Sequence, residues 1–157
     1  MCAKSQGAAS GLVREIPIDL NATPYLNWSW RVSAAFIRFD EKTKAGDDFP
    51  ARVYVIVDDG PFFWQTKALN YVWAGRAKPD SLWVSPYISN NVKLIAVESG
   101  TSRIGLWKQE KRNVVDDLKR AFGKSISQIE AVAVMTDTDD TGTLAEACYG
   151  DIFFSRD

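Results

Sequence analysis

Apolar and polar residues alternate along much of this chain, and this two-residue period restricts the fold more than any other feature. Residues 26–32 read LNWSWRV, in which every second side chain is apolar. Successive side chains of a β-strand point to opposite faces, so the pattern predicts a strand with one buried and one polar face. Residues 51–57 (ARVYVIV) are rich in β-branched residues and almost continuously apolar. They predict a central strand that is covered on both faces.

Similar patterns predict further strands at residues 12–20, 67–74, 92–98, 104–108, 129–136 and 145–155. One short helix is expected near 113–122, because Asn113 can cap its first turn and Gly123 can end its last turn. Strands without alternating helices indicate an all-β fold. The expected architecture is an antiparallel two-sheet sandwich of the jelly-roll kind. A length of 157 residues fits one domain, residues 1–157.

The composition excludes several classes of function. The chain has no histidine, which rules out His-based zinc and copper sites and nucleophile systems that need a histidine base. Its 19 basic and 20 acidic residues leave a net charge of -1. Nucleic acids and anionic membrane surfaces require a basic excess, so neither is an expected partner. No stretch approaches the roughly 20 apolar residues of a membrane-spanning helix.

The chain has two cysteines, Cys2 and Cys148. Two thiols make neither a CxxC-type metal site nor a disulfide framework. We expect one thiol near the terminus and one buried thiol. The alternative is a single Cys2–Cys148 bridge, because the first and last strands of a sandwich often lie close together.

Several short motifs follow one another in an order that is specific to one family. They are YLNWSWRV at 25–32, DDFPARVYV at 47–55, LNYVWA at 69–74, RNV at 112–114 with Asp117, MTDTDDTG at 135–142 and YGDI at 149–152. From about Gly11 onward, the chain resembles the bacterial family known as domain of unknown function 3047. The resemblance implies a galactose-binding-like sandwich and no particular activity. Where the family pattern has asparagine, this chain has Asp140.

The resemblance also bears on location and on the N-terminus. Relatives often look like exported proteins, which implies a periplasmic or secreted location, although no apolar signal region is visible in this chain. Family domains begin one or two strands upstream of Ala3. The resemblance therefore implies either a copy that lacks one or two N-terminal strands or a misassigned start.

Six tryptophans and several tyrosines suggest a sugar-binding surface, because flat aromatic faces pack on pyranose rings while Arg, Asn and Asp hold the hydroxyl groups. The alternation places Trp28, Trp30 and Trp73 in the core. A polar row formed by Asn27, Ser29 and Arg31 could be extended by Arg52 and Asn70 if the strands pair in a suitable register. The alternative is that the arginines form ion pairs at the sheet ends. The candidate ligand-binding residues are Arg31, Arg52, Asn70, Trp64, Trp83 and Tyr87.

Alternating carboxylates in the turn DTDDTG (137–142) resemble an oxygen cage for a structural calcium ion, which needs six to eight oxygen ligands. The candidate metal ligands are Asp137, Asp139, Asp140 and Asp151. No glutamate follows at the spacing of a calcium loop. The alternative is a polar turn in which Asp and Thr side chains accept hydrogen bonds from backbone N–H groups.

These features together favour a non-catalytic module that binds a carbohydrate or a similar polar ligand. One alternative is a structural or assembly protein of the cell envelope, which would show a broad exposed apolar patch. The other is a carboxylate-dependent glycoside hydrolase, which needs two carboxyl groups that face each other across a cleft. Adjacent acidic residues on a strand point to opposite faces, so the three Asp-Asp pairs of the chain do not form such a couple by themselves.

Overall fold

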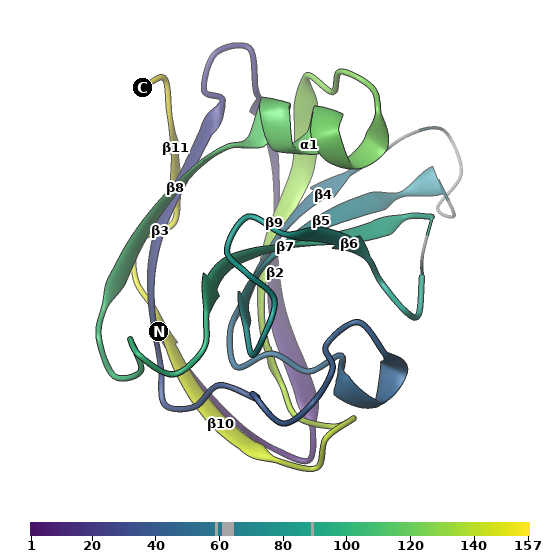
Figure 1. Ribbon diagram of the computed structural model, residues 1–157. Helices are drawn as coiled ribbons and strands as arrows, with labels where there is room; N and C mark the ends of the chain where they lie inside the picture. The colour runs from purple at the N-terminus through teal and green to yellow at the C-terminus, as the bar shows by residue number, and fades with distance from the viewer. Residues whose placement is uncertain (59, 61–64, 89) are drawn as a thin grey trace.

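Alternating side chains produce two β-sheets that enclose one apolar core. The computed structural model describes residues 1–58, 60, 65–88 and 90–157. The five-stranded sheet has the order β1-β10-β3-β11, and β8 also pairs with β3 (Figure 1). The six-stranded sheet has the order β2-β9-β4-β5-β7-β6. This confirms the expected all-β two-sheet sandwich. The strands are β1 (Cys2–Gln6), β2 (Ala9–Asp19), β3 (Tyr25–Val32), β4 (Arg52–Val57), β5 (Lys67–Ala74), β6 (Leu82–Val84), β7 (Val92–Ser99), β8 (Lys108–Asn113), β9 (Gln128–Asp137), β10 (Leu144–Tyr149) and β11 (Phe153–Ser155).

Large aromatic side chains join the two sheets in the main core. On the five-stranded sheet, Trp28 and Trp30 are buried, as predicted. Trp28 lies 5.3 Å from Tyr71 between ring centres, and Trp30 lies 6.0 Å from Trp73. Tyr71 and Trp73 belong to β5, so these two pairs connect the layers directly. Aromatic pairs at such distances contribute about 0.5 to 1.5 kcal/mol beyond their buried area.

A second, smaller core lies on the outer face of the six-stranded sheet. Residues 33–50, which we call the covering segment, link β3 to β4 and contain the short 3₁₀ helix η1 (Lys44–Gly46). Phe49 at the end of this segment packs among apolar side chains of β5, β6 and β7: Val72, Ala74, Trp83, Leu94 and Ala96. β5 is therefore buried on both faces along most of its length, whereas Tyr54 and Ile56 on the outer face of β4 are only partly buried, so the cover predicted for both faces of the run at 51–57 is incomplete.

The helix α1 (Val114–Phe122) forms at the predicted position, at one end of the sandwich (Figure 1). The side chain of Asn113 accepts hydrogen bonds from the backbone N–H groups of Val115 and Asp116. Gly123 ends the helix with a φ angle of 73°, a conformation that glycine adopts without strain. No helix in the described part of the chain is long and apolar enough to cross a membrane.

Strand pairing departs from the expectations in two respects. β5 and β7 run parallel, whereas an antiparallel sandwich was expected. The reason is that residues 75–91 return the chain to the starting end of β5 and contain β6, which itself pairs antiparallel with β7. The strand expected at 104–108 is also wrong, because residues 101–105 form turns and the strand β8 begins at Lys108.

The cysteines form a disulfide, so the expectation of two free thiols is wrong. β1 pairs antiparallel with β10, and this register places Cys2 directly opposite Cys148. Their Cα atoms are 4.0 Å apart, and 146 residues separate them in sequence. The bridge therefore ties the first strand of the chain to its penultimate strand.

Candidate functional site

A polar pocket of about 350 Å³ lies on the outer face of the six-stranded sheet, beside the second core. β4, β5 and β9 supply its floor, and the covering segment, the β6–β7 loop and the β9–β10 turn supply its walls. The outward-facing side chains of β4 that line the pocket, Arg52 and Tyr54, are polar, whereas the outward-facing side chains near Phe49 are apolar and covered. The polar side chains that line the pocket are Asp47, Arg52, Tyr54, Asn70, Ser85, Tyr87, Asp137, Asp139 and Asp140.

Arg52 is the only cation among these lining residues, and it is 5% exposed. Its Nε donates to Asp137 Oδ1 at 2.9 Å, and its Nη2 donates to Asp137 Oδ2 and to the backbone oxygen of Asp47. The backbone N–H of Phe49 also donates to Asp137 Oδ1 at 3.0 Å. A buried charge needs such partners to offset the loss of hydration. The ion pair therefore holds the covering segment against β4 and β9.

Asp47 is buried, and it has fewer partners than Asp137. Its Oδ1 lies 3.8 Å from Arg52 Nη1, which is too far for a hydrogen bond, and this oxygen has no hydrogen-bond partner among the described residues. Burial raises the pKa of Asp47 to about 7. Arg52 opposes this shift, and the nearby carboxylates of Asp137, Asp140 and Asp48 add to it. Asp47 is therefore a carboxyl group that changes charge near neutral pH.

Asn70 and Tyr54 form the deeper wall of the pocket. They lie directly opposite each other on β5 and β4. The hydroxyl of Tyr54 donates to the sulfur of Met135 at 3.2 Å. Asn70 is 1% exposed, and its Oδ1 has no hydrogen-bond partner within the described part of the chain. A buried oxygen without a donor costs about 1 to 3 kcal/mol, so this position favours a ligand that donates a hydrogen bond.

Tyr87 stands at the rim and is 51% exposed. Its hydroxyl donates to the carboxylate of Asp140, and this hydrogen bond is the main reason why the pKa of Tyr87 is raised to about 12. The ammonium group of Lys44 lies 5.2 Å from the centre of the Tyr87 ring. The ring is the one aromatic surface from the predicted ligand set that the structure places at the pocket mouth.

Three carboxylates at the acidic end of the pocket lie close together. Oxygens of Asp48, Asp137 and Asp139 all lie within 4.8 Å of one another. Two of the three carboxylates already have partners. Asp48 accepts from the backbone N–H groups of Asp140 and Thr141 at 3.3 and 2.6 Å, and Asp137 binds Arg52. The backbone N–H groups of the turn thus bond to a carboxylate of the covering segment, and Asp137 at the start of the turn accepts the N–H of Phe49 in return.

The pocket brings together six of the ten candidate site residues: Arg52, Asn70, Tyr87, Asp137, Asp139 and Asp140. Asn27, Ser29 and Arg31 lie at alternate positions of β3, but Arg52 and Asn70 do not extend this polar row, because β4 and β5 belong to the six-stranded sheet. Arg31 belongs to β3 in the other sheet, where it is exposed near Trp107 and Cys148. Asp151 lines a separate hollow over the five-stranded sheet. The alternation of apolar and polar residues predicts which face of a strand a side chain occupies, but it does not predict which sheet the strand joins.

Of the two tryptophans expected at exposed positions, Trp83 alone lies among the residues that the structure describes, and it does not form an exposed platform. Trp83 is 8% exposed and packs on Phe49 in the second core, so the prediction of an exposed platform is wrong for this residue. Its position beside turn residues suggested exposure, but the covering segment buries it. Trp64 lies outside the residues that the structure describes.

Sequence reasoning missed Asp47 and Tyr54, which line the pocket, and Asp48, which lies beside its acidic end. All three lie in the motif DDFPARVYV at 47–55, from which only Arg52 was predicted as a site residue. Its two aspartates directly precede a buried strand that carries an outward arginine. That arrangement was a usable signal, because a buried arginine requires nearby carboxylates.

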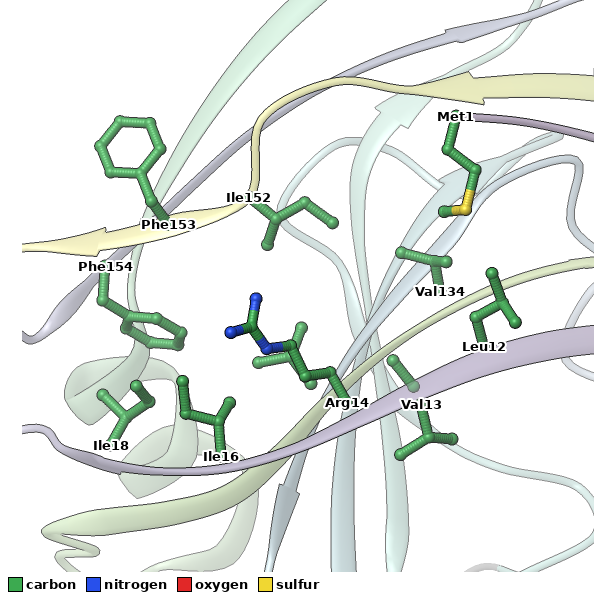
Figure 2. A pocket seen from close by; sticks show the side chains of 12 residues that line it. Met1, Leu12, Val13, Arg14, Ile16, Ile18, Val134, Ile152, Phe153 and Phe154 are labelled. Atoms are coloured by element: carbon green, nitrogen blue, oxygen red, sulfur yellow. The ribbon is translucent and has the colours of Figure 1, made fainter.

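A second hollow, the apolar groove, has a volume of about 450 Å³ and lies along β2, between the six-stranded sheet and residues 152–154 beside the other sheet. Residues of β2, β9 and the 152–154 segment line it, and Figure 2 shows Arg14 extending into it among aliphatic and aromatic side chains. Leu12, Val13 and Phe153 are more than half exposed there. The groove offers apolar contact area, but apart from Arg14 none of the described residues that line it has a polar side chain that could bind a ligand.

The fold and the pocket define an all-β sandwich with a buried arginine–carboxylate site on its outer face. The chain belongs to the family described as protein of unknown function DUF3047, whose family model matches residues 1–153. This confirms the resemblance seen in the sequence motifs. A search among curated proteins found no match.

Proposed function

We propose that this protein is a binding module whose polar pocket holds a carbohydrate or a similar polyhydroxylated ligand. The observation that carries the proposal is the buried oxygen of Asn70, which has no donor within the described structure and lines a pocket of about 350 Å³. The hydroxyl group of a ligand would supply the missing donor. Tyr87 at the rim offers an aromatic surface for the apolar face of a sugar ring.

A glycan array tests this proposal. We expect the wild-type chain to bind one class of saccharide, and we expect Asn70→Ala and Tyr87→Ala to weaken that binding about fivefold, because one hydrogen bond or one ring contact is worth about 1 kcal/mol. Arg31→Ala, on the other sheet, is the matched control and should bind like the wild type. An array without hits, or hits that the pocket variants leave unchanged, would count against the proposal.

A structural calcium ion is an alternative occupant of the acidic end of the pocket. The three neighbouring carboxylates of Asp48, Asp137 and Asp139 support it. Calcium added to chelator-treated protein should then raise the melting temperature, and Asp139→Ala should abolish the rise. An identical melting curve with and without calcium would show that the site does not bind the ion.

Asp47 keeps a hydrolase open as an alternative for the same pocket. A glycoside hydrolase needs one protonated carboxyl group as its general acid, and a pKa of about 7 suits that role. The distinction is simple to measure. A hydrolase would shorten a bound oligosaccharide and lose this activity in Asp47→Asn, whereas a binding module would return the oligosaccharide intact.

The second candidate function is a role in assembly at the cell envelope, and the apolar groove favours it. Sedimentation velocity over a range of concentrations tests self-assembly through this surface. Self-association that Leu12→Glu abolishes would support the assembly role, and a wild-type monomer at all concentrations would oppose it.

The disulfide supports a periplasmic or secreted location for either function, because disulfides persist in oxidising compartments.

A further inference from the structure

We propose that the ligand of the polar pocket carries a protonated amine, which makes amine-bearing sugars its ligand class. This inference rests on the proposed binding function of the pocket and adds the charge of the ligand to it. Two observations carry it: the balance of charges on the pocket wall, and the kind of hydrogen-bonding groups that are left without a partner there.

The wall carries more negative than positive groups. Four carboxyl groups line the pocket, from Asp47, Asp137, Asp139 and Asp140, against the single guanidinium of Arg52. Arg52 is already bound in two hydrogen bonds to Asp137. A cationic ligand would offset the remaining negative charge, and an anionic ligand such as a uronic acid would meet repulsion.

The groups without partners are acceptors. Within the described structure, Asn70 Oδ1 and Asp47 Oδ1 are buried and receive no hydrogen bond. The carboxylate of Asp139 is exposed at the same pocket. The hydroxyl groups of Tyr54 and Tyr87, by contrast, already donate to Met135 and Asp140. An ammonium group has three N–H donors and no acceptor, and it therefore matches this set of groups.

The same contacts favour an ammonium group over a divalent cation. Calcium requires six to eight oxygen ligands. Here Asp48 accepts two backbone N–H groups, and Asp137 accepts Arg52 and the N–H of Phe49. An ammonium group needs only three acceptors and leaves these bonds in place.

Calorimetric titration with 6-amino-6-deoxyglucose and with glucose tests the inference, since the two sugars differ only by an amine in place of a hydroxyl. We expect the amino sugar to bind about tenfold tighter at pH 8, because a charge-assisted hydrogen bond exceeds a neutral one by about 1 to 2 kcal/mol. Asp139→Asn, an exposed change that should not affect folding, should reduce this advantage, and Arg31→Gln on the other sheet should not.

The possible failures are distinguishable. If glucose or another neutral sugar binds as tightly as its amino derivative, and Asn70→Ala weakens both, the inference is wrong and the proposed function stands. If the amino sugar binds only when calcium is present, the ammonium assignment is wrong and the metal takes its place. If no saccharide binds in these titrations or on the glycan array, the proposed function fails and the inference fails with it.

Discussion

At the scale of single residues, Arg52 links three parts of the molecule. It sits at an outward position of β4, where it contacts Asp137 from β9 and the backbone of Asp47 from the covering segment. Its guanidinium carbon also lies 4.5 Å from the centre of the Phe49 ring. Loss of one partner from a buried ion pair leaves the other charge without compensation, which costs far more than the pair itself contributes.

We expect Arg52→Met to lower the free energy of unfolding by about 3 to 5 kcal/mol, because Asp137 would remain buried without its cation. Urea unfolding of the variant and the wild type measures this change. Arg31→Met is the matched control at an exposed arginine and should cost about 1 kcal/mol or less. Equal losses in the two variants would contradict the role given to Arg52.

Asp47 should make stability depend on pH. Burial raises its folded pKa to about 7, above the unfolded value near 3.8, so the folded state keeps the proton to higher pH. The free energy of unfolding should therefore fall between about pH 4 and pH 7, by at most about 1.4 kcal/mol per pH unit, and level off above.

Comparison with Asp47→Asn isolates this contribution. Glu110, whose pKa burial raises to about 6, adds a slope of the same sign in both proteins. Urea unfolding at pH 4, 5.5, 7 and 8 should show a smaller loss of stability with rising pH in Asp47→Asn. Parallel curves for the two proteins would show that Asp47 titrates normally in the folded state.

At the scale of elements, the covering segment creates the pocket by its close contact with the sheet. Gly75, just after β5, approaches the backbone of this segment so closely that an added Cβ would lie 2.6 Å from the carbonyl oxygen of Phe36. The side chain of Glu41 adds a second attachment, since its Oε1 accepts from the backbone N–H groups of Arg76 and Ala77.

Gly75→Ala should therefore displace the covering segment, since a backbone oxygen cannot move aside as a flexible side chain can. We expect a loss of about 1 to 3 kcal/mol in the free energy of unfolding, together with weaker binding in the polar pocket. Thermal unfolding and the glycan array measure the two effects. The control is Gly105→Ala, because an added Cβ at that glycine meets nothing within 4 Å, although its φ of 79° carries a strain cost of its own.

Strands whose side chains alternate between apolar and polar can be predicted from the sequence, whereas strands without this alternation cannot. Strands β3, β4, β5, β7 and β9 have clear patterns because the core covers one or both of their faces. β8 reads KQEKRN and pairs only with β3, so no apolar pattern marks it. β6 has only three residues. The strand expected at 145–155 is divided into β10 and β11 around residues 150–152.

The pocket could be predicted only in part, for a related reason. Asp137, Asp139 and Asp140 lie in one turn, and their proximity follows from sequence. Arg52 and Asn70 come together because β4 and β5 are neighbours, and that pairing is a property of the sheet order. Asp47 reaches the site through the path of the covering segment, which no periodic pattern encodes.

At the scale of the whole molecule, the disulfide should supply much of the stability. It closes a loop across a separation of 146 residues, and the entropy that such a bridge removes from the unfolded chain corresponds to about 5 kcal/mol in the chain-entropy model, with measured values typically about 2 to 4 kcal/mol. We expect the double variant Cys2→Ser, Cys148→Ser to unfold at a markedly lower temperature. Differential scanning calorimetry with and without a reductant measures the loss. A wild type whose melting temperature is unaffected by full reduction would contradict it.

The same bridge decides how the domain responds to mechanical load. A force applied between residues 1 and 157 would pass from β1 through the two sulfur atoms into β10, and would leave the six-stranded sheet and its pocket outside the stretched path. Only residues after Cys148 could lengthen, including the short strand β11. With the disulfide intact, the distance between Cys2 and Cys148 would stay nearly fixed under tension, and the polar pocket would keep its shape.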